Sequence, residues 1–242
     1  MLSLRGDKMN RLKSKRFLIV LAYIVLMVGG AILSGIFIGM IVVSINPTQD
    51  INHLTEALDA YLLSEMGIFL STVLPALLTL IVILVLGWQP LKDDFKKLTS
   101  FKAYVSVVLV TMGCILVLNQ VVSLFYDQMS VPENEQLIQL MFEQQPIGLL
   151  LTTLICAPLT EELVFRYGLM SKKEGGLLQT TMSILINALI FAGIHVLGDV
   201  QMILMYLPLA LGVALSYRYS KFNLWYPIGV HFLNNLIAML FM

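Results

Sequence analysis

The chain has 242 residues, of which 58% are hydrophobic and only 12% are charged, and its formal net charge is +0. Soluble domains carry about 25% charged residues, so this composition excludes an ordinary soluble enzyme and favours a protein of the lipid bilayer. The balanced charge also argues against nucleic acid as a partner, because such partners need a basic surface.

The N-terminal half contains a basic start and three long apolar runs. Residues 1–16 carry six Lys or Arg side chains. The apolar run 17–45 is too long for the roughly 7–15-residue core of a signal peptide, so we expect it to remain as the first membrane span. Further spans are expected at 61–88 and 103–125. After a polar, acidic stretch, residues 135–143 are expected to form a short amphipathic helix on the surface.

Four further apolar runs complete the chain, at 147–170, 178–197, 202–217 and 224–242. Only helices and closed barrels satisfy the backbone in lipid, and the sequence lacks the period-two alternation of barrel strands. We therefore predict an all-α fold, a polytopic transmembrane helical bundle of about seven spans, in the cell membrane.

The basic residues predict the orientation of these spans. With the N-terminus in the cytoplasm, the cytoplasmic segments are the tail, the loops 89–102 and 171–177, and the turn 218–223, which hold six, four, two and two Lys or Arg residues. Arg166 is the fifteenth, and none falls in a segment assigned to the outside. This pattern obeys the positive-inside rule and predicts a cytoplasmic N-terminus. We expect the chain to divide into a basic cytoplasmic tail, N-terminal spans and a C-terminal core, at residues 1–16, 17–145 and 146–242.

Three charged side chains interrupt the fourth apolar run, within the stretch from Pro158 to Arg166. A charge at membrane depth costs at least about 2.5–3.5 kcal/mol on insertion scales, so it is rarely placed there without a function. Glu162 and Arg166 are four residues apart and can pair on one face of a helix. Glu161 points to another face and needs a partner from elsewhere in the chain.

Two histidines and an asparagine lie in later apolar runs and are candidates for that partner. His195 is near the end of the fifth run, while His231 and Asn235 share a helical face in the seventh. A carboxylate and an imidazole can share general-base work on a water, and a second His with an Asn can donate hydrogen bonds to an oxyanion. Taken singly, each His suits a packing role and the Asn suits interhelical bonding. The combination in three late spans favours catalysis.

We expect the other polar residues in or near the apolar runs to have structural roles. Asn119 and Asn187 are expected to be interhelical hydrogen-bonding residues, and His53 a surface residue. Helix rise alone would place His195 about 10 Å or more from Glu161 in depth. We expect the two to meet because residues 174–179 are not helical, with Gly175-Gly176 as the breaker.

Three motifs together resemble a known family. Glu161-Glu162-x-x-x-Arg166, Phe191-x-x-x-His195 and His231-x-x-x-Asn235 occur in order, each in an apolar run. They are similar to the signature of the CPBP intramembrane proteases, which include type II CAAX prenyl endopeptidases and the bacterial Abi or bacteriocin-immunity proteins. The resemblance covers roughly residue 150 to the C-terminus, so the part at 146–242 is expected to be the protease core.

The resemblance implies peptide-bond hydrolysis within the membrane, on a membrane-associated peptide or protein. It assigns Glu161 as general base and His195 as its helper in activating the water. His231 and Asn235 would form the oxyanion site, and Glu162 with Arg166 would hold the helix and tune the charge of the site.

Two accounts of cofactor use remain open. Zinc could be held by Glu161, His195 and His231, with one open coordination position. The sequence has no His-Glu-x-x-His motif, and an Asn beside His231 suits an oxyanion role better than a ligand role. We favour a mechanism that requires no cofactor.

Two other functions compete with the protease. A bacteriocin-immunity or membrane scaffold protein could keep the same fold and bind a partner without catalysis. A transporter could use Glu161 as a proton relay. The intact motif set favours the protease, and the absence of evident inverted repeats in the sequence disfavours the transporter.

Overall fold

The computed structural model describes residues 2–47, 50–125, 133–170, 176–196 and 202–241 of the chain. Every regular element in these ranges is helical, which confirms the all-α prediction. In chain order, the helices are α1 (Leu2–Ile45), α2 (Ile51–Leu62), α3 (Glu65–Ile68), η1 (Phe69–Val73), α4 (Leu74–Phe95), α5 (Phe101–Ser123), α6 (Glu133–Gln144), α7 (Pro146–Leu149), η2 (Leu150–Cys156), α8 (Ala157–Glu161), η3 (Glu162–Leu169), α9 (Leu177–His195), α10 (Ile203–Tyr219) and α11 (Trp225–Leu240).

Two of the long helices combine α-helical and π-helical turns. α3, η1 and α4 form one continuous helix, Glu65–Phe95, and α7, η2, α8 and η3 form another, Pro146–Leu169. π-turns in α-helices are uncommon and often occur at functional sites. The second helix carries the Glu-Glu stretch at the change from α8 to η3.

Five helices in the described part of the chain are long and apolar enough to cross a membrane. They are Ser14–Ile45, Glu65–Phe95, Phe101–Ser123, Pro146–Leu169 and Leu177–His195. The sixth and seventh expected spans correspond to α10 and α11, which have 17 and 16 residues and fall below the usual span length of about 20 residues. α1 is one uninterrupted helix from Leu2, so the backbone of the expected tail continues directly into the first span.

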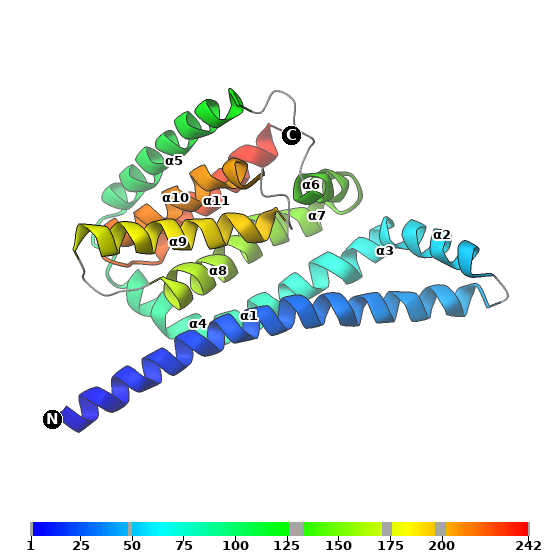
Figure 1. Cartoon of the computed structure of the whole chain (residues 1–242), viewed down its shortest axis with the longest axis horizontal. Helices are drawn as coiled ribbons and strands as arrows, with labels where there is room; N and C mark the ends of the chain where they lie inside the picture. The colour runs from blue at the N-terminus through cyan, green and yellow to red at the C-terminus, as the bar shows by residue number, and fades with distance from the viewer. Residues whose placement is uncertain (1, 48–49, 126–132, 171–175, 197–201, 242) are drawn as a thin grey trace.

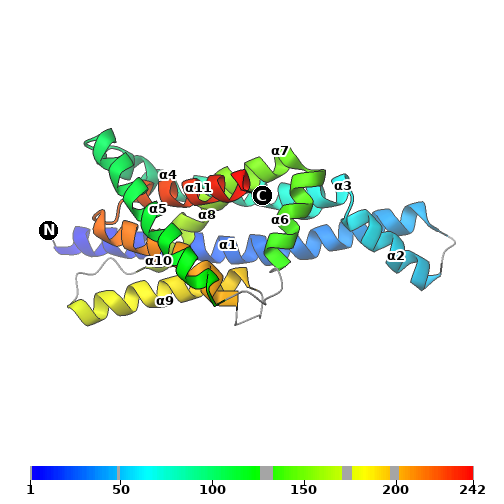
Figure 2. The ribbon, with the colours of Figure 1, turned by 90° about the horizontal axis from the view of Figure 1, so that it is seen from above.

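The helices form a bundle around η3 and α8 (Figure 1). α1 runs along the lower edge of the view beside α4, and it also packs on η3. α9 packs along α10, while α5 covers the other side of α10 and α11 (Figures 1 and 2). The expected amphipathic helix is present as α6, which lies at the far end of the bundle from the N-terminus.

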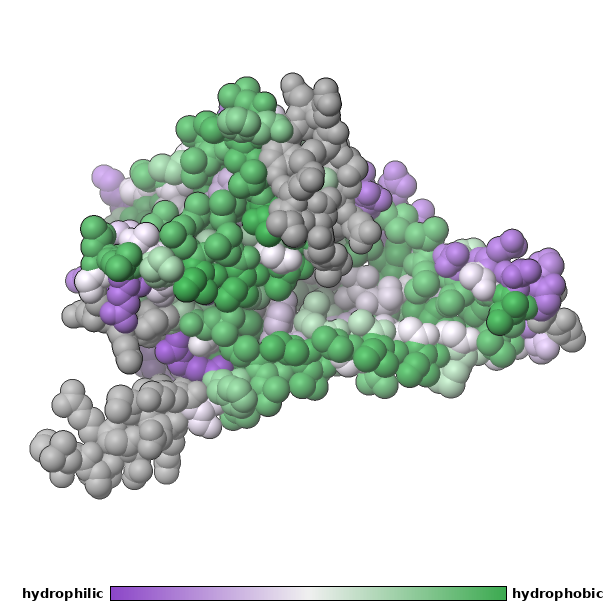
Figure 3. Space-filling view, in the orientation of Figure 1, coloured by the Kyte–Doolittle hydropathy of each residue, from purple (hydrophilic) through white to green (hydrophobic). Residues whose placement is uncertain are grey.

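The outer surface of the bundle is apolar, as a lipid-facing surface must be. Hydrophobic side chains cover the face shown in Figure 3, along α1 and α9. Leu33 of α1 and Val85 of α4 are 68% and 75% exposed. Soluble monomers rarely expose patches of this extent. The chain is a multi-pass membrane protein.

The principal core lies where η3 meets α1, α4, α9, α10 and α11. Its centre contains Leu163, Phe165, Phe191 and Tyr217, all at most 3% exposed. Gly87 of α4 permits this packing, because a Cβ at that position would lie 2.7 Å from a methyl group of Leu163. A second, smaller core joins η1, α6 and α7, so α6 is anchored to the bundle.

The predicted cytoplasmic end of the bundle is closed by specific contacts. Arg16 of α1 donates hydrogen bonds to the carbonyl oxygens of Tyr167 and Met170, which lie at the end of η3. Asp94 near the end of α4 accepts a hydrogen bond from the backbone N–H of Leu224, at 3.1 Å. These contacts tie the first, second, fourth and seventh spans together where the basic loops lie.

The structure corrects the expected break before the fifth span. α9 begins at Leu177, so residues 177–179 are helical, and only Gly176 of the described residues in that segment is outside the helix. Residues 174 and 175 lie outside the described residues. α9 instead starts well beyond the end of η3 (Figures 1 and 2), and this displacement along the bundle brings His195 to the depth of Glu161.

Candidate functional site

Glu161 faces two histidines from different helices. Its Oε2 atom lies 3.6 Å from Nε2 of His195 and 3.9 Å from Nε2 of His231. The Glu161 side chain is 12% exposed, and Oε2 has no direct hydrogen-bond partner among the described residues. At such distances two polar atoms can be connected through a bridging water instead of a direct hydrogen bond.

Glu162 points away from Glu161 and into the protein core. Its Oε1 atom lies 3.0 Å from Nδ1 of His231, and its Oε2 atom lies 3.0 Å from Nε of Arg166. Glu162 and Arg166 are both fully buried, so the predicted ion pair exists and is entirely screened from solvent. Adjacent positions on a helix point about 100° apart, which explains why one carboxylate faces the cavity and its neighbour faces the core.

Asn187 completes the surroundings of the buried guanidinium. Its Oδ1 accepts a hydrogen bond of 2.6 Å from Nη1 of Arg166, and its Nδ2 donates one of 2.7 Å to the carbonyl oxygen of Phe165. The guanidinium carbon also lies 4.7 Å from the centre of the Phe191 ring, in cation–π range. Asn187 is thus an interhelical hydrogen-bonding residue, as expected, and it connects α9 to η3.

His195 is held in one orientation and one tautomer. Its Nδ1 lies 2.7 Å from the carbonyl oxygen of Phe191. A carbonyl oxygen only accepts, so Nδ1 carries the hydrogen, and Nε2 of the neutral ring is an acceptor facing Glu161. The ring stacks on Tyr206 of α10, with centroids 5.2 Å apart and planes at 28°. Sequence reasoning missed Tyr206, because no motif spacing connects it to the other residues.

His231 and Asn235 lie one turn apart on α11, on the other side of Glu161. His231 is 3% exposed, and its Nδ1 contact with Glu162 leaves Nε2 facing Glu161. Asn235 Nδ2 donates one hydrogen bond, of 2.8 Å, to the carbonyl oxygen of Thr153. A carboxamide has two N–H groups, so one donor of Asn235 is still available to a ligand.

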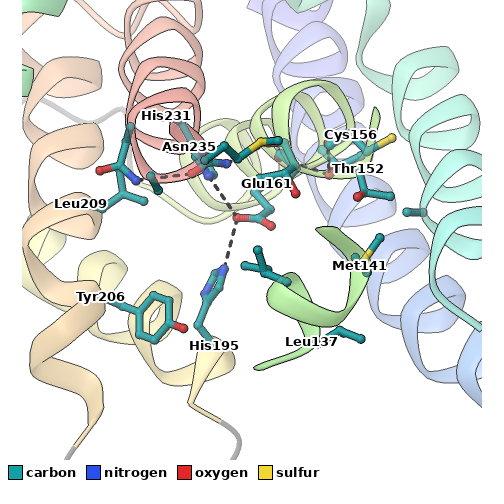
Figure 4. A pocket seen from close by; sticks show the side chains of 18 of the residues that line it. Leu137, Met141, Thr152, Cys156, Glu161, His195, Tyr206, Leu209, His231 and Asn235 are labelled. Carbon is teal, nitrogen blue, oxygen red and sulfur yellow. Dashed lines mark hydrogen bonds and ion pairs between the residues drawn. The ribbon is translucent and has the colours of Figure 1, made fainter. Parts of the chain in front are cut away.

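These side chains line a cavity of about 390 Å³. Figure 4 shows Glu161 at its centre, with His195 and His231 on either side and Tyr206 next to His195. The volume falls in the range of about 300–1,000 Å³ that is typical of ligand sites. The hydroxyl of Thr79, a residue 2% exposed, also lines the cavity and has no hydrogen-bond partner among the described residues.

Among the described residues, no three His, Cys, Asp or Glu side chains are disposed to hold a metal ion. That absence includes Glu161 with His195 and His231, the set that the sequence suggests for zinc. The same set suits a bound water, because Oε2 of Glu161 and Nε2 of a neutral His195 can each accept a hydrogen bond from it.

The structure therefore brings all six predicted site residues into one cluster. Glu161, His195, His231 and Asn235 line the cavity, while Glu162 and Arg166 lie behind it in the core. A comparison with known families gives one match: residues 143–237 are similar to the family described as type II CAAX prenyl endopeptidase Rce1-like. No curated protein and no solved structure matches the chain.

Proposed function

We propose, from the similarity of residues 143–237 to the family described as type II CAAX prenyl endopeptidase Rce1-like, that this chain hydrolyses peptide bonds within the membrane by a glutamate-activated water. The observation that carries the proposal is the position of Glu161, which lines the cavity and whose Oε2 atom lies 3.6 Å from Nε2 of His195. A buried carboxylate in this position is costly, so a catalytic use accounts for its retention.

Glu161 and His195 are suited to hold one water between them. Both Oε2 of Glu161 and Nε2 of neutral His195 are acceptors, and a water has two hydrogens to donate, one to each. The water's lone pair then points away from both groups, into the cavity where a peptide carbonyl would lie. This geometry prepares the water for attack at a fixed position, which is a large part of what an active site contributes.

In the proposed reaction, the water oxygen bonds to the scissile carbonyl carbon as Glu161 takes a proton from the water. The carbonyl oxygen becomes an oxyanion, stabilised by the second N–H of Asn235 and by Nε2–H of His231 in its imidazolium form. Glu161 then returns its proton to the peptide nitrogen, and the C–N bond breaks. The products are a carboxyl group and an amine, and Glu161 is ionised again.

Glu162 and Arg166 would act as positioning residues in this scheme. The Glu162 carboxylate accepts from Nδ1–H of His231, and this contact aims Nε2 of His231 toward Glu161. With His231 as imidazolium, the four groups Glu161, Glu162, Arg166 and His231 sum to zero charge. A net charge of zero for these four groups matters, because an unpaired charge in the protein interior is strongly unfavourable.

Product analysis in membranes tests the proposal. Membranes from cells that express the native chain, Glu161→Gln or Glu56→Gln are compared by mass spectrometry of their peptides, at matched protein levels. Glu56 is an exposed carboxylate on α2, far from the cavity, so its substitution serves as the matched control.

We expect a set of cleavage products that depends on Glu161 and is unchanged in Glu56→Gln. The complementary amine and carboxyl ends of each cut identify the bond that was hydrolysed. Identical peptide profiles for the native chain and Glu161→Gln would reject the catalytic role and leave the binding or immunity function as the remaining explanation.

A further inference from the structure

Resting on the proposed function, we propose that the cavity opens at the extracytoplasmic end of the bundle and takes an uncharged, extended segment of a membrane-anchored peptide from that side. The type II CAAX family name describes C-terminal peptides with a free carboxylate. The chemistry of this cavity indicates a different substrate class. Two independent observations support the proposal: where the lining residues lie, and which charges they carry.

The lining residues reach the end of the bundle that is opposite the basic loops. α6 contributes Leu137, Ile138 and Met141 to the lining, and Figure 4 shows Leu137 and Met141 on the side of Glu161 away from α11. Asn119 near the end of α5 and Met239 near the end of α11 also line the cavity. With the N-terminus inside, as the positive-inside rule predicts, all of these positions lie toward the extracytoplasmic end.

The opposite end of the same cavity is closed by the principal core. The residues that follow Glu161 toward the cytoplasm, from Glu162 to Tyr167, are all buried. None of these residues lines the cavity. Arg16 also donates hydrogen bonds to the backbone carbonyl oxygens of Tyr167 and Met170, at the cytoplasmic end of η3. A peptide arriving from the cytoplasm would have to displace this packing before it reached Glu161.

α6 forms part of the rim of the opening. Met141 is 3% exposed and packs in the small core with η1 and α7, while Leu137, one turn earlier, is 38% exposed. Gln145, directly after α6, donates a hydrogen bond of 2.9 Å to the carbonyl oxygen of Glu65. The C-terminal half of α6 is therefore fixed at the rim, and its apolar face is turned to the cavity.

The lining carries no Lys or Arg side chain to receive a carboxylate. Apart from Glu161, His195 and His231, the described residues of the lining are uncharged, and neither Lys nor Arg is among them. In the proposed mechanism the His231 imidazolium is already neutralised within the Glu161, Glu162, Arg166 and His231 group, so a free C-terminal carboxylate beside Glu161 would add an unbalanced negative charge. The Thr79 hydroxyl, which has no partner among the described residues, and the remaining N–H of Asn235 suit the amide groups of an extended backbone.

Thiol labelling in sealed vesicles tests which side the opening faces. Leu137→Cys places a thiol at the rim, and Leu177→Cys places one at the first residue of α9, where Leu177 is 84% exposed. A membrane-impermeant biotin maleimide is applied to right-side-out and inverted vesicles. The labelling of the native chain, which contains Cys114 and Cys156, is subtracted as background. Met205→Cys, at a cavity-lining position 38% exposed near the start of α10, is a second rim variant in case Leu137→Cys does not fold.

We expect the rim thiols to react in right-side-out vesicles and Cys at position 177 to react only in inverted ones. The label at the rim should also suppress the products that depend on Glu161, whereas the label at position 177 should not. Rim labelling confined to inverted vesicles, or absent from both, would overturn the proposal. If the rim thiols react in right-side-out vesicles but no cleavage product depends on Glu161, the proposed protease function is rejected. The extracytoplasmic position of the opening would still be supported.

Discussion

Removing the guanidinium of Arg166 should destabilise the protein severely, and Arg166→Met tests this. Arg166 and Glu162 are both fully buried, with Nε and Oε2 3.0 Å apart. In this variant the Glu162 carboxylate remains in the core without the permanently charged guanidinium beside it. Unit charges about 4 Å apart attract each other by about 4 kcal/mol at an effective dielectric of about 20, and the variant loses an attraction of this order. Measured losses on breaking one side of a buried pair are about 3–5 kcal/mol, so both estimates agree.

The assay is unfolding of the purified protein in mixed detergent micelles, followed by the loss of helical signal. Lys102→Met, which removes an exposed cation at the start of α5, is the matched control and should cost at most about 1 kcal/mol. The double variant Glu162→Leu with Arg166→Met removes both charges. It should recover most of the stability, because apolar replacements of buried pairs are often neutral or stabilising.

The double variant also separates folding from catalysis. His231 would lose the carboxylate that accepts from its Nδ1, so we expect a folded protein with impaired hydrolysis. A loss below about 1 kcal/mol for Arg166→Met, comparable to that of an exposed pair, would refute the reasoning. The same conclusion would follow if the double variant were no more stable than Arg166→Met.

Further predictions concern the cavity and its supports. Glu161→Gln should lower hydrolysis by about 10²–10⁴-fold, the usual contribution of general-base catalysis, with unchanged unfolding behaviour; a loss of activity only through unfolding would contradict the assigned role. Tyr206→Ala should lower kcat by about two- to twelve-fold, because aromatic stacking is worth about 0.5–1.5 kcal/mol; an effect confined to KM would argue against positioning of His195. Asn187→Ala should cost about 1–3 kcal/mol in unfolding, since it leaves the buried Nη1 donor of Arg166 without its amide acceptor; full stability would show that water replaces the amide. Treatment with EDTA should leave hydrolysis unchanged, and loss of activity that zinc restores would favour the metal-dependent account.

The residues of the functional cluster could be predicted from the sequence, because ionisable side chains are rare in apolar runs. Glu161, Glu162, His195 and His231 each stand in a run that has few other polar groups, and the cost of placing them in lipid limits the reasons for their presence. The pairing of Glu162 with Arg166 also followed from spacing alone, since residues four apart on a helix share a face. Asn187 lies two turns before His195, and that periodicity would have connected it to the site as well.

Spacing along the chain could not determine how the spans are offset from one another. The depth mismatch between Glu161 and His195 suggested a missing helical turn, but α9 is helical from Leu177 and is displaced along the bundle instead. Displacement of one helix along another is set by side-chain packing between distant segments, such as Leu163 against Gly87. Local sequence does not encode that contact.

The sequence by itself determined the membrane class, the helical fold class and the ionisable groups of the site, because each depends on composition or on periodicity within one helix. Only the tertiary structure decided that Tyr206 stacks on His195, that Thr79 lines the cavity, and that α6 forms its rim. These contacts join residues from different helices, such as Tyr206 of α10 and His195 of α9, through tertiary packing. The physical reason is that burial energy depends on which surfaces meet, and that is a property of the folded bundle rather than of any one span.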